Sequence, residues 1–310
     1  MFSIVFPGQG SQTVGMSHDF YSKYDLFKKI FREADEILDF KISKLILEGP
    51  KEDLDKTENT QPAIFLVSYC IFNLLKEINE EILTKAKYFA GHSLGEYTAL
   101  TCSGSLNFSD TLKILKKRGK AMQSAVPNGV GGMLAVLNSN FETINNILVD
   151  NKSDFECYIA NDNSNGQIVV SGKNNDLESL TEELKKKSIK NIKLAVSAPF
   201  HCKLMNPATQ IMQKEIFNTE FKDSNNLIIS NVTSKEMQKS QDIKDLLVKQ
   251  IESPVRWRES IIYMIKNNVK NFVEIGPGKI LSGMIKRIDR NVNIVSVNEL
   301  HDLKNIDLND

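Results

Sequence analysis

Cysteine and histidine are both scarce in this chain of 310 residues, which contains four of each. The cysteines are scattered without a Cys-x-x-Cys pair, and the histidines show no metal-ligand spacing. We therefore expect no disulfide framework, no structural metal and a location in the reducing cytoplasm. The residues concerned are Cys70, Cys102, Cys157, Cys202, His18, His92, His201 and His301.

An excess of charge and a long apolar run are also lacking. Lys and Arg together number 39, as do Asp and Glu, so the net charge is zero. This balance argues against a general nucleic-acid binder, which needs a basic footprint, although a local basic patch stays open. The sequence contains no run of about 18 apolar residues, so no membrane span is expected. Met1 to Phe6 reads as a strand without a basic region or a cleavage site, so no secretory signal is expected.

The most informative stretch is Gly91-His92-Ser93-Leu94-Gly95. It lies between a strand-like run at 88–90 and a predicted helix at 96–102. Gly-x-Ser-x-Gly between a strand and a helix is typical of a nucleophile elbow. The glycines are needed because a Cβ would collide in so sharp a turn. Ser93 is therefore a candidate nucleophile, with a purely structural turn as the alternative.

A second glycine-rich turn, Pro7-Gly8-Gln9-Gly10, follows the predicted strand Phe2 to Phe6. An oxyanion hole needs two N–H donors, and the residue after the nucleophile, Leu94, can supply one of them. The loop at 7–10 is the best candidate for the second donor. A simple strand-to-helix connection explains the same residues.

Helical patterns follow. Residues 25–38 form an amphipathic pattern. Thr60 is the expected N-cap of the next helix, with Pro62 at an early helical position, and Ser109 is the expected cap of a helix that reaches about Ala125.

Arg118 lies on or beside the apolar stripe of the helix after Ser109, whereas the lysines of that helix fall on the opposite side. An inward guanidinium needs an anionic partner. That partner is either an internal carboxylate or the carboxylate of a substrate. The inward stripe consists of Leu112, Leu115, Gly119 and Met122.

Residues 127–197 have a rhythm of their own. Predicted strands at 132–137, 158–161, 167–171 and 192–196 and predicted helices at 140–149 and 177–187 follow the order βαββαβ of a ferredoxin-like unit. The chain is thus predicted to be an α/β protein with one domain formed by 1–126 and 198–310 and an inserted domain at 127–197.

His201 stands where the chain returns from this insert, a place that favours an interdomain cleft. A capping or surface histidine is the alternative. As a base for Ser93, the neighbouring His92 is a poor competitor because adjacent side chains in such a turn point apart. Further on, the turn Gly276-Pro277-Gly278-Lys279 could cradle a phosphate, but it lacks the known phosphate-loop spacings.

Six motifs in order now resemble the malonyl-CoA:acyl-carrier-protein transacylases of bacterial fatty-acid synthesis, over nearly the whole chain. The motifs are Pro7-Gly8-Gln9-Gly10-Ser11-Gln12, Thr60-Gln61-Pro62-Ala63, Gly91-His92-Ser93-Leu94-Gly95-Glu96-Tyr97, Arg118-Gly119, the stretch from Ser197 to His201, and Glu274-Ile275-Gly276-Pro277-Gly278-Lys279.

The resemblance implies an α/β-hydrolase-like large domain with the ferredoxin-like insert, and it implies a role for each matching residue. Ser93 would be the nucleophile, His201 its base, and a carbonyl or amide of Gln250 the group that orients the histidine. The N–H groups of Gln9 and Leu94 would form the oxyanion hole. The implied substrate-binding residues are Arg118, which would pair with the malonyl carboxylate, Phe200, whose bulk would disfavour an α-methyl branch, Gln61 and Asn161.

The implied reaction is transfer of malonyl from malonyl-CoA to the phosphopantetheine thiol of acyl carrier protein through a malonyl-serine. It needs no cofactor, since the CoA thioester is a substrate, and a monomer is expected. An acidic carrier protein would meet a basic rim, for which Lys116, Lys117, Lys203, Lys286 and Arg287 are candidates. A serine acyl hydrolase with the same nucleophile is the alternative activity, and a non-catalytic thioester-binding protein is the alternative outside enzymes.

Overall fold

The computed structural model of the protein describes residues 1–78, 83, 85–196 and 198–305. Its strands are β1 Phe2–Phe6, β2 Tyr88–Gly91, β3 Gly131–Leu137, β4 Cys157–Ser164, β5 Gln167–Lys173, β6 Asn191–Lys193, β7 Leu227–Ile229, β8 Glu236–Met237, β9 Asn271–Ile275 and β10 Asn293–Val297. Its helices are α1 His18–Lys23, α2 Asp25–Leu38, α3 Ile42–Glu48, α4 Lys51–Leu54, α5 Thr57–Ile78, α7 Leu94–Cys102, α8 Phe108–Ser124, α9 Phe141–Asp150, α10 Asn174–Lys186, α11 Asn206–Asn218, α12 Ser240–Gln250, α13 Trp257–Lys266 and α14 Ile280–Ile288, with 3₁₀ turns at Lys203–Met205 and Leu300–Asn305.

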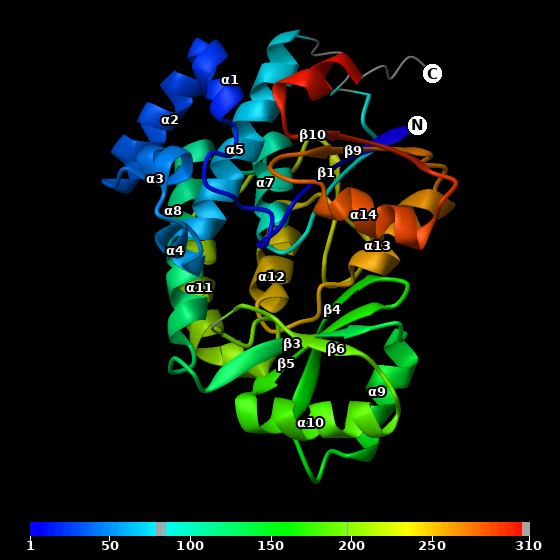
Figure 1. Ribbon diagram of the computed structural model, residues 1–310. Helices are drawn as coiled ribbons and strands as arrows, with labels where there is room; N and C mark the ends of the chain where they lie inside the picture. Colours follow the sequence, from blue (N-terminus) through cyan, green and yellow to red (C-terminus); the bar gives the residue numbers. More distant parts are fainter. Residues whose placement is uncertain (79–82, 84, 197, 306–310) are drawn as a thin grey trace.

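A six-stranded sheet in the order β10-β9-β1-β2-β7-β8 forms the centre of the larger part of the molecule (Figure 1). Its strands pair in parallel except at β8, which is antiparallel to β7. The carboxyl ends of β1, β2 and β9 therefore meet at one edge, where open α/β sheets bind their ligands.

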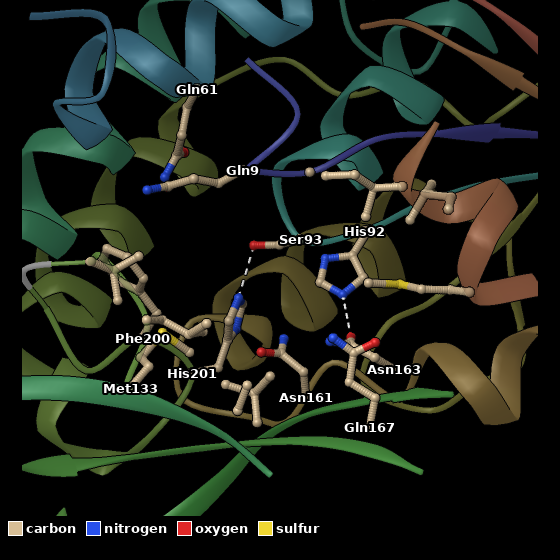
Figure 2. A pocket seen from close by; sticks show the side chains of 18 of the residues that line it. Gln9, Gln61, His92, Ser93, Met133, Asn161, Asn163, Gln167, Phe200 and His201 are labelled. Carbon is tan, nitrogen blue, oxygen red and sulfur yellow. Dashed lines mark hydrogen bonds between the residues drawn. The ribbon is translucent and has the colours of Figure 1, made fainter. Parts of the chain in front are cut away.

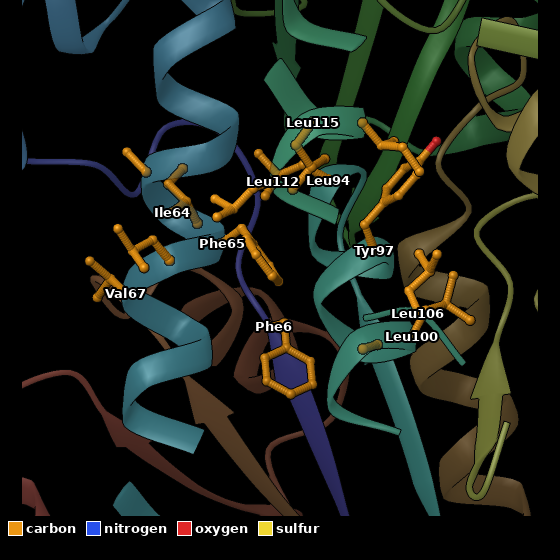
Figure 3. Packing of buried hydrophobic residues seen from close by; sticks show 14 of the residues in the cluster. Phe6, Ile64, Phe65, Val67, Leu94, Tyr97, Leu100, Leu106, Leu112 and Leu115 are labelled. Carbon is orange, nitrogen blue, oxygen red and sulfur yellow. The ribbon is translucent and has the colours of Figure 1, made fainter. Parts of the chain in front are cut away.

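Helices cover both faces of this sheet because its strands are apolar on both sides. Phe6 and Phe89 belong to the core that includes α5, α7 and α8, which Figure 3 shows in part. Val5 and Ala90, which alternate with them along β1 and β2, pack instead against α13 and α14. This alternation follows the two-residue period of a strand.

A second, four-stranded antiparallel sheet has the order β4-β5-β3-β6 and carries α9 and α10 on one face (Figure 1). Leu134 and Ile168 pack on that face with the two helices. Met133 and Val169, one residue away along the same strands, belong to the main core instead. The bare face of the small sheet is thus turned toward the large sheet.

Two predicted helix starts are wrong. The helix containing Pro62 begins at Thr57, and the Thr60 hydroxyl donates backward to Leu54 O at 2.6 Å instead of capping. The cap of α8 is Asn107, whose side chain accepts from Asp110 N at 2.8 Å, so Ser109 lies inside the helix. In both cases the backbone turns earlier than the cap pattern indicated. Ser197, one boundary of the predicted insert, lies outside the described residues.

No helix in the described ranges combines the length and the apolar character that crossing a membrane requires.

Candidate active site

The turn between β2 and α7 has the sharp geometry that its glycines predicted. Ser93 has a φ of 53°, a conformation that side-chain-bearing residues rarely adopt. A Cβ on Gly91 would overlap the backbone of Gly95, and a Cβ on Gly95 would overlap Phe6 O. Strained backbone of this kind costs about 1–3 kcal/mol and persists where surrounding structure enforces it. Here the end of β1, which pairs with Gly91 and lies against Gly95, encloses the turn.

Ser93 and His201 meet at the edge of the sheet. Ser93 Oγ lies 2.8 Å from His201 Nε2, although the two residues are 108 positions apart (Figure 2). On the other side of the ring, His201 Nδ1 lies 2.8 Å from the main-chain oxygen of Gln250. A carbonyl only accepts, so Nδ1 carries the proton of the neutral ring and Nε2 is left free to accept from the serine. The backbone carbonyl of Gln250, rather than its side chain, therefore orients the histidine.

The protonation state of His201 suits a base. Burial lowers the pKa of His201 to about 3, and the positive charge of Arg118 acts in the same direction. Only 4% of the residue is exposed. The ring is consequently neutral at physiological pH and can take a proton from Ser93.

Arg118 is buried beside this pair, with 1% exposure. Its Nη1 donates to Gln61 Oε1 at 2.8 Å, and its Nη2 donates to Gln250 Oε1 at 2.9 Å and to Ser93 Oγ at 3.2 Å. Within the described residues these bonds go only to uncharged groups, and Nε has no acceptor. The guanidinium thus retains donors for an anion.

Two backbone N–H groups are available beside the nucleophile. In the described part of the chain, the amides of Gln9 and Leu94 have no hydrogen-bond acceptor. A Cβ on Gly8 would lie 2.6 Å from His92 O, so the loop at 7–10 passes directly over the elbow. The two turns thus lie close together, as an oxyanion hole built from both would require.

The pocket in front of Ser93 has a volume of about 170 Å³ and lies between the two sheets. The large part contributes Gln9, Gln61 and Arg118 to its wall. Figure 2 shows Gln9 and Gln61 across the cavity from Met133 and Asn161, which the small sheet contributes. Phe200 also lines it, held by its main-chain oxygen, which accepts from Ser171 Oγ at 2.6 Å. The structure therefore brings most of the side chains singled out from the sequence to one cavity: Gln9, Gln61, Ser93, Arg118, Asn161, Phe200 and His201 line it. Gln250 lies behind His201, and the side chain of Leu94 packs in the core.

Among the described residues, the hydrogen bond of the His92 ring goes to Asn163 and not to Ser93 Oγ. Its Nε2 lies 2.8 Å from Asn163 Oδ1 of β4, and its ring lies against Trp257. Burial lowers its pKa. His92 thereby links the elbow to the small sheet.

Asn231 and Glu96 are parts of the site that the sequence patterns did not reveal. The Asn231 side chain accepts from Ser93 N at 2.8 Å and donates to Gly91 O at 2.7 Å, which ties the elbow to the end of β7. Glu96, buried under the turn, accepts from Gln250 Nε2 at 2.6 Å. The position of Asn231 could have indicated its role, because it follows β7, which is parallel to β2 and ends at the same side of the sheet as Ser93.

The turn at 276–279 does not offer its helix terminus to a phosphate. The carboxylate of Glu274 accepts from Leu281 N at 3.0 Å and from Ser282 N at 2.8 Å, so it occupies the start of α14. Lys279 lies 3.7 Å from Asp302. No group of three or more His, Cys, Asp or Glu that could hold a metal ion is found among the described residues.

A serine held against a neutral histidine, with a carbonyl behind the ring and free amides in front, defines the class of proteins that form acyl-serine intermediates. The chain belongs to the acyl transferase domain family, whose model matches residues 3–302.

Relatives of known name agree with this placement. The malonyl CoA-acyl carrier protein transacylase of Bacillus subtilis is 40% identical over 96% of this chain and 93% of its own length. The acyl-carrier-protein S-malonyltransferase of Bartonella henselae superposes with a TM-score of 0.95 at 35% identity, covering 98% of this chain and 97% of that one. A malonyl-transacylase solved in complex with a type II polyketide acyl-carrier protein superposes with a TM-score of 0.94 at 35% identity, covering 98% of this chain and 97% of that one.

Proposed function

We propose that this chain transfers the malonyl group of malonyl-CoA to the phosphopantetheine thiol of acyl carrier protein, in fatty-acid biosynthesis. The observation that carries the proposal is the buried Arg118 within hydrogen-bond distance of the nucleophile Ser93. Full-length similarity to transacylases of that name supports it.

In the first half-reaction, His201 Nε2 takes the proton of Ser93 Oγ as the oxygen attacks the thioester carbonyl. The developing oxyanion receives the N–H groups of Gln9 and Leu94. The C–S bond then breaks, the CoA sulfur takes the proton from His201, and malonyl remains as an ester of Ser93.

In the second half-reaction, the carrier thiol enters the same cleft and gives its proton to His201. Its sulfur attacks the ester carbonyl, and Ser93 Oγ leaves with the proton returned by the ring. The kinetics are therefore ping-pong. No cofactor takes part, because the acyl group arrives already activated as a thioester.

Selectivity follows from Arg118, which would hold the distal carboxylate of malonyl. An acetyl group would leave those donors unpaired in a buried site, and sites with unpaired polar groups reject such analogues strongly. Gln61 orients the guanidinium through Nη1, while Phe200 and Asn161 close the acyl pocket against larger groups.

The proposed architecture is an α/β-hydrolase-like domain of residues 1–126 and 198–310 with a ferredoxin-like insert at 127–197. The order β4-β5-β3-β6, with α9 after β3 and α10 after β5, supports the ferredoxin-like assignment.

A monomer in the cytoplasm is proposed as well, and the free thiols of Cys70, Cys102, Cys157 and Cys202 agree with a reducing compartment. For carrier docking, Lys117 is paired with Glu215, whereas Lys116, Lys203, Lys286 and Arg287 form no ion pair within the described residues and stay candidates.

Incubation with malonyl-CoA, followed by mass spectrometry of the intact protein, tests the proposal. We expect a stable malonyl adduct on Ser93 that disappears when carrier protein is added. Steady release of CoA without any acceptor would instead identify a hydrolase, and absence of any adduct in an active preparation would overturn the covalent mechanism.

A further inference from the structure

Glu96 is a buried carboxylate that the proposed mechanism does not use. It is the third residue of α7 and is 0% exposed. Its Oε2 accepts from Gln250 Nε2 at 2.6 Å and from Asn231 N at 3.3 Å, whereas its Oε1 has no partner in the described part of the chain. A carboxylate with an unpartnered buried oxygen is costly, which points to a role beyond packing.

Gln250 joins Glu96 to Arg118 through a single amide. Its Nε2 donates to Glu96, and its Oε1 accepts from Arg118 Nη2 at 2.9 Å. The ionised carboxylate can only accept, so it requires the NH₂ end of the amide and turns the oxygen toward the guanidinium. Glu96 therefore helps to fix the side chain of Gln250, together with the main-chain oxygen of Ser93, which accepts from the same Nε2 at 3.0 Å. Through Gln250, Glu96 bears on the orientation of Arg118.

The two charges also interact directly through the protein interior. Burial raises the pKa of Glu96 to about 7, while the hydrogen bonds from Gln250 and Asn231 and the positive charge of Arg118 act in the opposite direction. The positive charge that acts on Glu96 is that of Arg118. The titratable and charged groups that act on Glu96 are Arg118 from α8 and Tyr97 from α7.

Building on the proposed function, we propose that Glu96 is the internal counter-ion of Arg118 and a positioning residue that takes up one proton when the malonyl carboxylate binds. In the empty cleft the anionic Glu96 balances the guanidinium through Gln250. When the substrate carboxylate reaches Arg118, two buried anions share one cation. The proton that then joins Glu96 comes from solvent and returns to it when malonyl leaves on the carrier.

Linkage makes this testable, since a ligand that promotes proton uptake must itself bind more tightly where protons are abundant. The affinity for malonyl-CoA should fall as pH rises from 6 to 8.5. The expected change is about fivefold or more, the lower end of couplings between two sites. Acetyl-CoA, which brings the same CoA but no carboxylate, should show no such change.

The Ser93→Ala variant allows the measurement because it binds malonyl-CoA without reacting. Calorimetric titration in two buffers of different ionisation enthalpy gives the number of protons taken up at pH 7. We expect uptake of a sizeable fraction of one proton with malonyl-CoA, none beyond the acetyl-CoA control, and none in Ser93→Ala/Glu96→Gln. The Gln substitution keeps an acceptor for Gln250 Nε2 but cannot ionise.

Uptake that persists in Ser93→Ala/Glu96→Gln would place the proton on another group, such as His201, and would overturn the inference. Malonyl-CoA binding to Ser93→Ala with no uptake and no pH dependence would overturn it as well, while leaving the proposed function standing. Failure of malonyl-CoA to bind, with acetyl-CoA binding retained, would overturn both. The pH series on Ser93→Ala needs no substitution at Glu96, so a misfolded double variant does not block the test.

Discussion

The helices α7 and α14 make an instructive pair, because both begin after a glycine-containing turn that follows a parallel strand of the same sheet. Each also has a fully buried glutamate near its start, Glu96 in one case and Glu274 in the other. Glu274 stands before its helix and accepts from the amides of Leu281 and Ser282. Glu96 stands inside its helix and turns away toward Gln250.

The difference shows that a glycine-rich turn before a helix does not by itself create an anion site. The positive end of α14 is neutralised by its own chain, whereas that of α7 is left for a ligand. A carboxylate that lies before the turn, as Glu274 does, can accept from the first amides of the helix and gives that helix start a structural role. A carboxylate that lies after the turn, as Glu96 does, leaves the start of its helix available for chemistry.

The strongest test of this contrast compares one serine at the start of each helix, Ser93 before α7 and Ser282 in the first turn of α14. Ser93→Ala removes the proposed nucleophile and should lower kcat by roughly 10⁴-fold or more, as loss of a nucleophile does elsewhere. Ser282→Ala, at the start of α14, should change kcat only a few-fold. Both are measured as malonyl transfer to carrier protein. Comparable losses in the two variants would show that the contrast is wrong.

Arg118→Ala should reduce malonyl transfer by roughly 10²- to 10³-fold, on the scale of one lost charge-assisted contact in a buried site. Acetyl transfer should be retained or should rise, because the unpaired guanidinium no longer opposes it. The ratio of the two rates is the measurement, because Arg118 also contacts Ser93 Oγ and the ratio cancels any effect that both substrates share. An equal loss for both substrates would refute the carboxylate clamp.

Glu274→Ala should remove the carboxylate that accepts hydrogen bonds at the start of α14. The amides of Leu281 and Ser282 would lose their acceptor, and the free energy of unfolding should fall by about 2 kcal/mol. Formate at high concentration should restore part of this loss by occupying the vacated position, and urea unfolding with and without formate measures it. Transfer activity should fall less than about tenfold. Unchanged stability would mean that the carboxylate does not hold the helix.

The smallest expected effect is that of acid on the acylation step. Because the pKa of His201 is lowered to about 3, the neutral ring that accepts the serine proton persists at pH values where an ordinary histidine is charged. The single-turnover rate of acylation at saturating malonyl-CoA should therefore stay level between pH 8 and pH 5. A fall centred near pH 6.5 would show that His201 titrates normally and that its burial has no such effect.

Several features could be predicted from the sequence because they depend on local pattern. The 25–38 helix, the β2–turn–α7 unit and the inward position of Arg118 all follow from periodicity and from glycine spacing within a few residues. The two helix caps were predicted wrongly, since Lys56 and Asn107 are followed by helical backbone earlier than the Thr60 and Ser109 patterns indicated.

The sequence alone thus supplies the chemical groups, which are the residue identities, and the sharp turn that presents Ser93, because short-range steric contacts at Gly91 and Gly95 govern that turn. Only the tertiary structure decided which groups meet: that the main-chain oxygen of Gln250 holds His201, that Asn231 anchors the elbow, and that Glu274 closes one helix terminus while Glu96 leaves another open. These contacts join residues far apart in the chain, and their geometry follows from the packing of whole strands and helices rather than from any local preference.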